Sequence, residues 1–242
     1  MIKPFFLALQ FLTRLPAKNY DKIADIDVGR SVIFYPLVGL IIGSILVGIE
    51  YAFSNVSAPL LALIILIASV LLSGGLHLDG LADSADGWLA GGDKQHSLTV
   101  MKDPTVGSAG VIVIVLVLLA KYIVLVEIVA DSNWLILLLA PVVSRSLVLF
   151  FLLKIPYASQ GGIAQSMVDN LPRSLTWFLL LLVVLITFIY FPIAMLFTLM
   201  GVYFLYQIMI KRLGGFTGDT LGAVIELSEL FLMFSILVLH AH

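Results

Sequence analysis

The chain has 242 residues, of which 61% are hydrophobic and only 12% charged, and its mean hydropathy is +1.14. A soluble domain is nearer half apolar and a quarter charged, so this composition indicates a polytopic membrane protein. The formal net charge is −2 and the basic residues are few and scattered, which gives no support for nucleic-acid binding. The lack of cysteine excludes disulfides, thiolate metal sites and a cysteine nucleophile.

The N-terminal region, up to residue 31, is the only long stretch of mixed polarity. Residues 4–15 are almost entirely apolar but too short to cross a bilayer, so we expect a short helix that lies in the interface or re-enters it. Pro16 ends this helix, and residues 17–30 predict a polar surface segment.

Apolar runs of membrane-spanning length follow along the rest of the chain. We place spans at residues 32–53, 58–75, 108–130, 134–154, 174–190, 192–209 and 220–240. The sequence therefore predicts an all-α polytopic membrane protein with about seven transmembrane helices. We expect residues 1–242 to form a single integral membrane enzyme domain.

The basic residues indicate how this arrangement lies in the membrane. Two of the thirteen Lys and Arg residues lie inside spans, and the others all fall on the side of the bilayer that holds the N-terminus. Because cytoplasmic loops carry the excess of Lys and Arg, we expect a cytoplasmic (inner) membrane protein with its N-terminus in the cytoplasm and its C-terminus outside.

An acidic stretch directly after the second span is the strongest candidate site. Asp79, Asp83 and Asp86 are spaced i, i+4 and i+7, so on a helix they point within an arc of roughly 60°. Three like charges on one face favour a divalent cation between them, and oxygen ligands favour a hard one such as Mg²⁺. The alternative is a solvated helix end with capping aspartates. His77 lies on the other side of this helix, as a second-shell partner of the metal or as an interfacial residue.

Two further segments bring polar residues to the same side of the membrane. The loop at residues 91–107 delivers Lys102, Asp103 and glycines, Gly107 among them, to the start of the third span, where free N–H groups suit phosphate; the alternative is an ordinary loop. The segment at 211–220 precedes the last span, in which Glu226 and Glu229 share a face close to that of Asp219. These acids complete a metal site with the aspartates, or are protonated and hydrogen-bonded within the bundle.

Lys121 and Arg145 are the two bases inside spans. Intramembrane charges usually face the bundle interior and pair. Lys121 either snorkels or pairs with Glu127, or supports the site from the second shell. Arg145 either forms a structural pair or binds a substrate phosphate.

Several motifs in order resemble one family. The segments LQFLTRLP at 9–16, FYPLVG at 34–39, LHLDGLADSADG at 76–87 and GGFTGDTLGA at 214–223 resemble motifs of the cobalamin synthase family, the adenosylcobinamide-GDP ribazoletransferases. The resemblance covers nearly the whole chain.

The resemblance implies an Mg²⁺-dependent membrane enzyme. In this family the 3′-hydroxyl of α-ribazole, or of its 5′-phosphate, attacks the phosphoanhydride of adenosylcobinamide-GDP, and GMP leaves as adenosylcobalamin or its 5′-phosphate forms. On this basis we expect the catalytic residues to be Asp83 and Asp86, with Asp86 as the proton acceptor. The metal ligands would be Asp79, Asp83, Asp86, Asp219, Glu226 and Glu229. The residues expected to bind substrate or phosphate are Arg14, Lys102, Asp103, Gly107, Arg145, Lys211, Arg212, Thr217 and Gly218. The sequence leaves open a homo-oligomer.

Other functions remain as alternatives. The stretch at 83–90 is similar to the start of the CDP-alcohol phosphotransferase motif, but Gly91 stands where that motif has arginine and its downstream aspartates are absent. A cation-coupled transporter would require helix breaks in corresponding positions of two repeats, which the hydropathy pattern lacks. An intramembrane aspartyl protease would require two aspartates within spans, and Asp219 lies at a span boundary.

Overall fold

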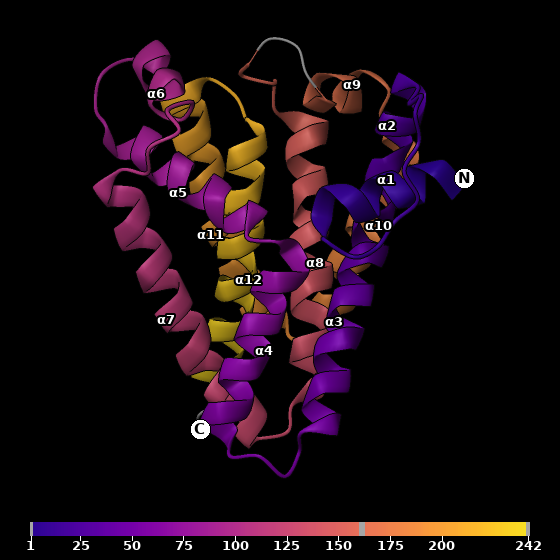
Figure 1. Cartoon of the computed structure of the whole chain (residues 1–242), viewed down its shortest axis with the longest axis vertical. Helices are drawn as coiled ribbons and strands as arrows, with labels where there is room; N and C mark the ends of the chain where they lie inside the picture. The colour runs from indigo at the N-terminus through magenta and orange to yellow at the C-terminus, as the bar shows by residue number, and fades with distance from the viewer. Residues whose placement is uncertain (1, 160–162, 241–242) are drawn as a thin grey trace.

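The computed structural model describes residues 2–159 and 163–240, which fold as a bundle of helices (Figure 1). The helices are α1 (Ile2–Leu12), α2 (Asp25–Ser31), the 3₁₀ turn η1 (Val32–Phe34), α3 (Tyr35–Ala52), α4 (Ala58–Ser73), α5 (Leu76–Leu89), α6 (Lys94–Val100), α7 (Ser108–Ala130), α8 (Trp134–Lys154), α9 (Ile163–Asp169), α10 (Arg173–Tyr190), α11 (Pro192–Leu213) and α12 (Gly218–His240).

The expected all-α polytopic architecture is confirmed. Among the described residues, six helical segments are long and apolar enough to cross a membrane, and a seventh span results if α4 and α5 count as one. The short N-terminal helix is present as α1. The first span differs from expectation, because α2, η1 and α3 make one run from Asp25 to Ala52. Asp25 and Asp27 in the first turn favour a helix start there, within the segment expected to be only a polar surface.

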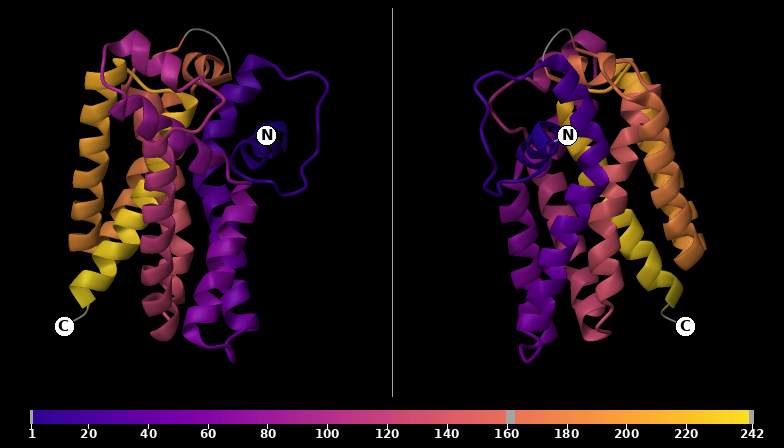
Figure 2. Two further views of the ribbon diagram at one scale, coloured as in Figure 1. Left: turned by 60° about the vertical axis from the view of Figure 1, so that its left-hand side comes forward. Right: turned by 90° about the vertical axis from the view of Figure 1, so that its right-hand side faces the viewer.

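Short helices gather at one end of the bundle. Figure 1 shows α6 and α9 at the same end as α2, whereas the α3–α4 loop, the α7–α8 loop and the C-terminus lie at the opposite end. Figure 2 shows the same division from two further sides. The expected basic loops therefore lie together at the end that carries α5 and α6.

A sharp bend separates α4 from α5. Gly74 and Gly75 both have positive φ, at 64° and 71°, and their N–H groups donate to the carbonyls of Leu71 and Val70 at 3.1 Å. This is the glycine-dependent way of ending a helix. The axis of α5 then turns by 84° from that of α4 and crosses the end of the bundle, which places the acidic stretch outside the long spans (Figure 1).

Two glycines bring α5 against α12. A Cβ atom on Gly80 would lie 2.7 Å from the backbone oxygen of Asp219, and one on Gly222 would lie 3.1 Å from the backbone of His77. Both contacts involve main-chain atoms, which cannot move aside as a flexible side chain would. The absence of a side chain at these positions therefore sets the distance between the two helices.

This contact gives a prediction for stability. Gly80→Ala should lower the midpoint of thermal unfolding in detergent, monitored by tryptophan fluorescence. The overpacking cost of roughly 1–3 kcal/mol exceeds the gain in helix propensity of about 1 kcal/mol. Gly48→Ala in α3 is the matched control, since nothing lies within 4 Å of its added Cβ atom. Equal midpoints for the two variants would contradict a close α5–α12 contact.

Candidate functional site

The three aspartates of α5 share its open face, as their spacing predicts. Asp79 is exposed and Asp83 and Asp86 are half-buried, whereas most of the residues between them are buried against neighbouring helices. The buried face of α5 packs on α7 and α12. The acidic face is therefore the polar side of this helix that is open to a ligand.

Asp219 lies beside Asp79 at the start of α12. Both side chains line a cavity of about 510 Å³ at this end of the bundle, and Gly218 lines it too. The contact at Gly80 holds the backbone of Asp219 against α5. The predicted meeting of the acidic stretch with Asp219 is thus present in the structure.

Charge repulsion acts on Asp83. Burial, together with the negative charges of Asp79, Asp219 and Asp86, raises the pKa of the Asp83 carboxyl to about 6. Within the described residues, no lysine or arginine forms an ion pair with these four carboxylates. The acidic face therefore carries negative charge that the protein itself leaves uncompensated.

Asp86 has a different role from its two neighbours. Its two carboxylate oxygens accept hydrogen bonds from the N–H groups of Gly107 and Gly110, at 2.8 and 2.9 Å. Those groups belong to the first turn of α7, so Asp86 caps that helix from another element. Each of its oxygens accepts one of these hydrogen bonds, so Asp86 takes the capping role that the sequence left open as an alternative.

The α6–α7 loop lies around this cap. Asp103 and Gly107 line a second cavity of about 340 Å³ together with Asp86, while Lys102 is exposed. The Asp103 carboxylate accepts hydrogen bonds from the Thr105 hydroxyl and N–H group, which lower its pKa. The N–H of Gly107, expected to face phosphate, is bonded to Asp86 instead.

The basic residues expected near phosphate lie at several points of the same end. The side chain of Arg14 lies over Gly74 at the α4–α5 bend, where an added Cβ atom would meet its Cγ at 2.3 Å. Lys211 and Arg212, at the end of α11, line a third cavity of about 690 Å³, and Arg212 also donates to the Gly91 carbonyl at 3.0 Å. None of the three side chains lines the cavity of Asp79 and Asp219.

Thr217 is engaged within its own turn. Its hydroxyl accepts a hydrogen bond from the Thr220 N–H at 3.2 Å, and the Thr220 hydroxyl accepts one from the Thr217 N–H at 2.8 Å. This reciprocal pair caps the start of α12. The buried Thr217 side chain therefore has a structural role at this turn, and its expected contact with substrate stays a prediction.

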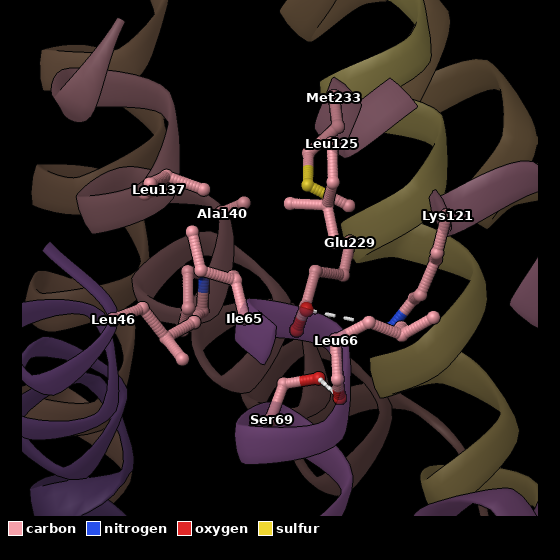
Figure 3. Close-up of a pocket in the computed structure, with 11 residues that line it drawn as sticks. Leu46, Ile65, Leu66, Ser69, Lys121, Leu125, Leu137, Ala140, Glu229 and Met233 are labelled. Carbon is pink, nitrogen blue, oxygen red and sulfur yellow. Dashed lines mark hydrogen bonds and ion pairs between the residues drawn. The ribbon is translucent and has the colours of Figure 1, made fainter. Parts of the chain in front are cut away.

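The bases and glutamates of the spans form one buried cluster. Lys121 of α7 contacts Glu226 at 2.6 Å and Glu229 at 3.3 Å, and Arg145 of α8 pairs with the other oxygen of Glu229, which also accepts a hydrogen bond from Ser144. Figure 3 shows Lys121 directed at Glu229 among leucine and isoleucine side chains. Lys121 thus pairs with the two α12 glutamates, and the expected pairing with Glu127 is wrong.

This cluster corrects the expected site. Two positive and two negative charges neutralise one another, as groups buried at bilayer depth must. Both oxygens of Glu229 and one oxygen of Glu226 are engaged in ion pairs, and Arg145 is 4% exposed and pairs with Glu229, so it lies out of reach of a phosphate at the acidic face. Within the described residues, no three acidic or histidine side chains form a ready metal-binding group. Asp79, Asp83 and Asp219 are not gathered into such a group either, but they lie outside the buried cluster and have no basic partner among the described residues, so they are the candidate ligands that remain, without the two glutamates and Arg145.

His77 is buried rather than interfacial. Its side chain is 4% exposed, it lines the same cavity as Asp79 and Asp219, and its Nδ1 atom has no hydrogen-bond partner. An unsatisfied buried polar atom is uncommon in folded proteins. This burial was hard to predict from the sequence, because His77 is two residues from Asp79 and so points away from it on a regular helix.

The buried cluster predicts a pattern of stability. Glu229→Gln should lower the unfolding midpoint strongly, because a buried charge without its partner costs about 3–5 kcal/mol. The double variant Arg145→Met/Glu229→Leu removes both charges and should lose less stability than Glu229→Gln. Tryptophan-fluorescence melting in detergent measures both, and a double variant less stable than the single one would contradict the ion pair.

The acidic face predicts a dependence on pH. The folded protein holds Asp83 with a pKa of about 6, above its ordinary value of 3.8. Above pH 6 the ionised side chain therefore disfavours the folded state, and Asp83→Asn should raise the unfolding midpoint at about pH 7.5 in metal-free buffer. The gain should shrink as pH falls through about 6 and vanish below about 4, where wild-type Asp83 is protonated in both states. A gain that is independent of pH would contradict the assignment.

Comparisons with known proteins extend over the same residues. The family model for cobalamin-5-phosphate synthase matches residues 4–237. A relative from Pseudomonas syringae pv. syringae, named adenosylcobinamide-GDP ribazoletransferase, is 42% identical over 98% of this chain and 99% of its own length. Relatives of the same name from Acinetobacter baumannii and Pseudomonas fluorescens are 41% and 45% identical over 97% and 93% of this chain, covering 97% and 95% of their own lengths. No solved structure matches the chain. These matches do not favour a transporter or a CDP-alcohol phosphotransferase. The chain belongs to the cobalamin-5-phosphate synthase family.

Proposed function

We propose that this protein is an adenosylcobinamide-GDP ribazoletransferase. It transfers the adenosylcobinamide-phosphate group of adenosylcobinamide-GDP to the 3′-hydroxyl of α-ribazole or its 5′-phosphate and releases GMP. The observation that carries the proposal is the family match over residues 4–237. The uncompensated carboxylates around a cavity at one end of the bundle support it, because phosphoryl transfer depends on positioning and charge stabilisation.

The donor set at the acidic face fits Mg²⁺. Asp79, Asp83 and Asp219 offer carboxylate oxygens, the ligands that hard divalent cations prefer, and they lack a basic partner among the described residues. When bound there, Mg²⁺ would supply positive charge against the phosphoanhydride of the donor.

Asp83 is the proposed proton acceptor. Its half-buried carboxylate lies on the acidic face and, unlike that of Asp86, accepts no hydrogen bond from the described part of the chain, so an oxygen is free to take the proton of the attacking hydroxyl. Asp86, the residue first expected in this role, has both oxygens engaged by the α7 N-terminus. Its proposed contribution is to hold α7 and the α6–α7 loop beside the reacting groups.

The proposed setting is the cytoplasmic (inner) membrane, with the N-terminus and the site facing the cytoplasm. The support is the collection of Lys and Arg residues in loops at the end that carries α5 (Figure 1). Nucleotide-activated substrates and Mg²⁺ are supplied from that compartment.

The test is GMP release by the purified protein in lipid vesicles with adenosylcobinamide-GDP, α-ribazole and Mg²⁺. We expect release only when all three are present. A folded protein that releases no GMP under these conditions would overturn the proposal.

Four variants separate the roles of the aspartates in this assay. Asp79→Asn and Asp219→Asn should raise the Mg²⁺ concentration for half-maximal rate, because each removes one charged ligand. Asp83→Asn should lower kcat by roughly 10²–10⁴-fold, the usual contribution of a general base. Asp86→Asn keeps one acceptor oxygen for the α7 cap and should lower kcat much less. Equal losses of kcat in Asp83→Asn and Asp86→Asn would contradict this division.

A further inference from the structure

The cavity beside the acidic face has aromatic walls. It measures about 510 Å³ and is bounded by residues of α1, α3, α5, α8, α9 and α12. Phe11, Tyr35 and Tyr157 line it, and the ring of Tyr157 is held against Phe216 with centroids 5.4 Å apart. Sites for flat heteroaromatic ligands have walls of this kind, because planar rings stack on aromatic side chains.

One polar group of the cavity lining lacks a good partner. The hydroxyl of the buried Tyr35 reaches only the sulfur of Met167, at 3.5 Å. Sulfur is a weak acceptor. Buried polar atoms are normally satisfied, so this hydroxyl suits a ligand that brings a hydrogen-bond acceptor such as a ring nitrogen.

The charges around the cavity restrict what it can hold. Its lining includes Asp79 and Asp219 but no lysine or arginine. A phosphate group, whether of GDP or of α-ribazole 5′-phosphate, would find no base there and would have to lie at the acidic face, where Mg²⁺ would offset its charge. An uncharged ring with hydroxyl groups near the two acids is compatible with this lining.

Size separates the two substrates of the proposed reaction. The volume lies within the roughly 300–1,000 Å³ of small-molecule sites. A corrin with its amide side chains and adenosyl group is several times larger than a nucleoside. The smaller substrate is an N-ribosylated benzimidazole, whose base is largely apolar and carries one free ring nitrogen.

We propose that this cavity is the acceptor site, with the benzimidazole among Phe11, Tyr35 and Tyr157 and the ribose hydroxyls directed to Asp79 and Asp219. This inference rests on the proposed function and extends it to the place of one substrate. The free ring nitrogen accepts a hydrogen bond from the Tyr35 hydroxyl. The attacking 3′-hydroxyl then lies at the acidic face, and the corrinoid stays outside the cavity.

The experiment measures binding of α-ribazole alone and then both KM values. Ala164 of α9 lines the cavity, so Ala164→Phe fills it and Ala164→Ser is the matched control. In calorimetry on detergent-solubilised protein with Mg²⁺ and no corrinoid, Ala164→Phe should weaken α-ribazole binding by roughly tenfold or more. In GMP release it should raise KM for α-ribazole similarly and leave KM for adenosylcobinamide-GDP unchanged, whereas Ala164→Ser resembles the wild type.

Tyr35→Phe covers the case in which Ala164→Phe fails to fold, as judged by its unfolding transition. It removes one hydroxyl and should weaken α-ribazole binding by roughly two- to tenfold, the usual effect of one hydrogen bond. Active enzyme in which the folded variants bind α-ribazole as the wild type does would overturn the acceptor site and leave the proposed function standing. A rise in KM for adenosylcobinamide-GDP alone would also overturn the acceptor site and leave the proposed function standing. Wild-type protein that binds α-ribazole but releases no GMP would overturn only the proposed function.

Discussion

The close approach of α5 to α12 is the constraint on which the rest of this end of the molecule depends. Glycine at positions 80 and 222 lets the two backbones meet, and this contact holds Asp219 beside Asp79 and Asp83 against their mutual repulsion. Packing therefore overcomes electrostatics here, and the result is a face with negative charge ready for a cation. The glycine pair at the α4–α5 bend is the other requirement, because α5 reaches α12 only after turning by 84°.

The spans were accessible from the sequence because bilayer thickness sets their length. The expected ranges 108–130 and 134–154 coincide with α7 and α8, since apolar runs bounded by polar turns leave little choice. The direction of α5 was not accessible. Gly74 and Gly75 signal that a helix ends, but where the next helix points depends on what it packs against. The shared face of Asp79, Asp83 and Asp86 followed from helical spacing, whereas the capping role of Asp86 depends on partners 21 and 24 residues away.

The pairing of the intramembrane charges could not be predicted from the sequence either. Physical reasoning requires Lys121 to have an acidic partner, but it does not say which one. Glu127 is near in sequence, yet the partners lie 105 and 108 residues further along the chain. Only the arrangement of α7, α8 and α12 decides this choice. As a consequence, the six carboxylates expected to form one metal site are divided. Glu226 and Glu229 are neutralised inside the bundle, Asp86 caps α7, and the remaining three are left open beside an aromatic cavity.

The buried cluster also bears on how the chain enters the membrane. Lys121 and Arg145 are synthesised on α7 and α8, well before the glutamates of α12 that neutralise them. Each such charge raises the free energy of inserting its helix by about 2.5–3.5 kcal/mol. The apolar residues of the same helix must offset this cost when α7 and α8 enter the bilayer. Completion of the C-terminal helix ends this state. A nascent chain that stops short of α12 leaves two bases within the bilayer without their acidic partners, so the last helix to be made completes the charge balance of the bundle.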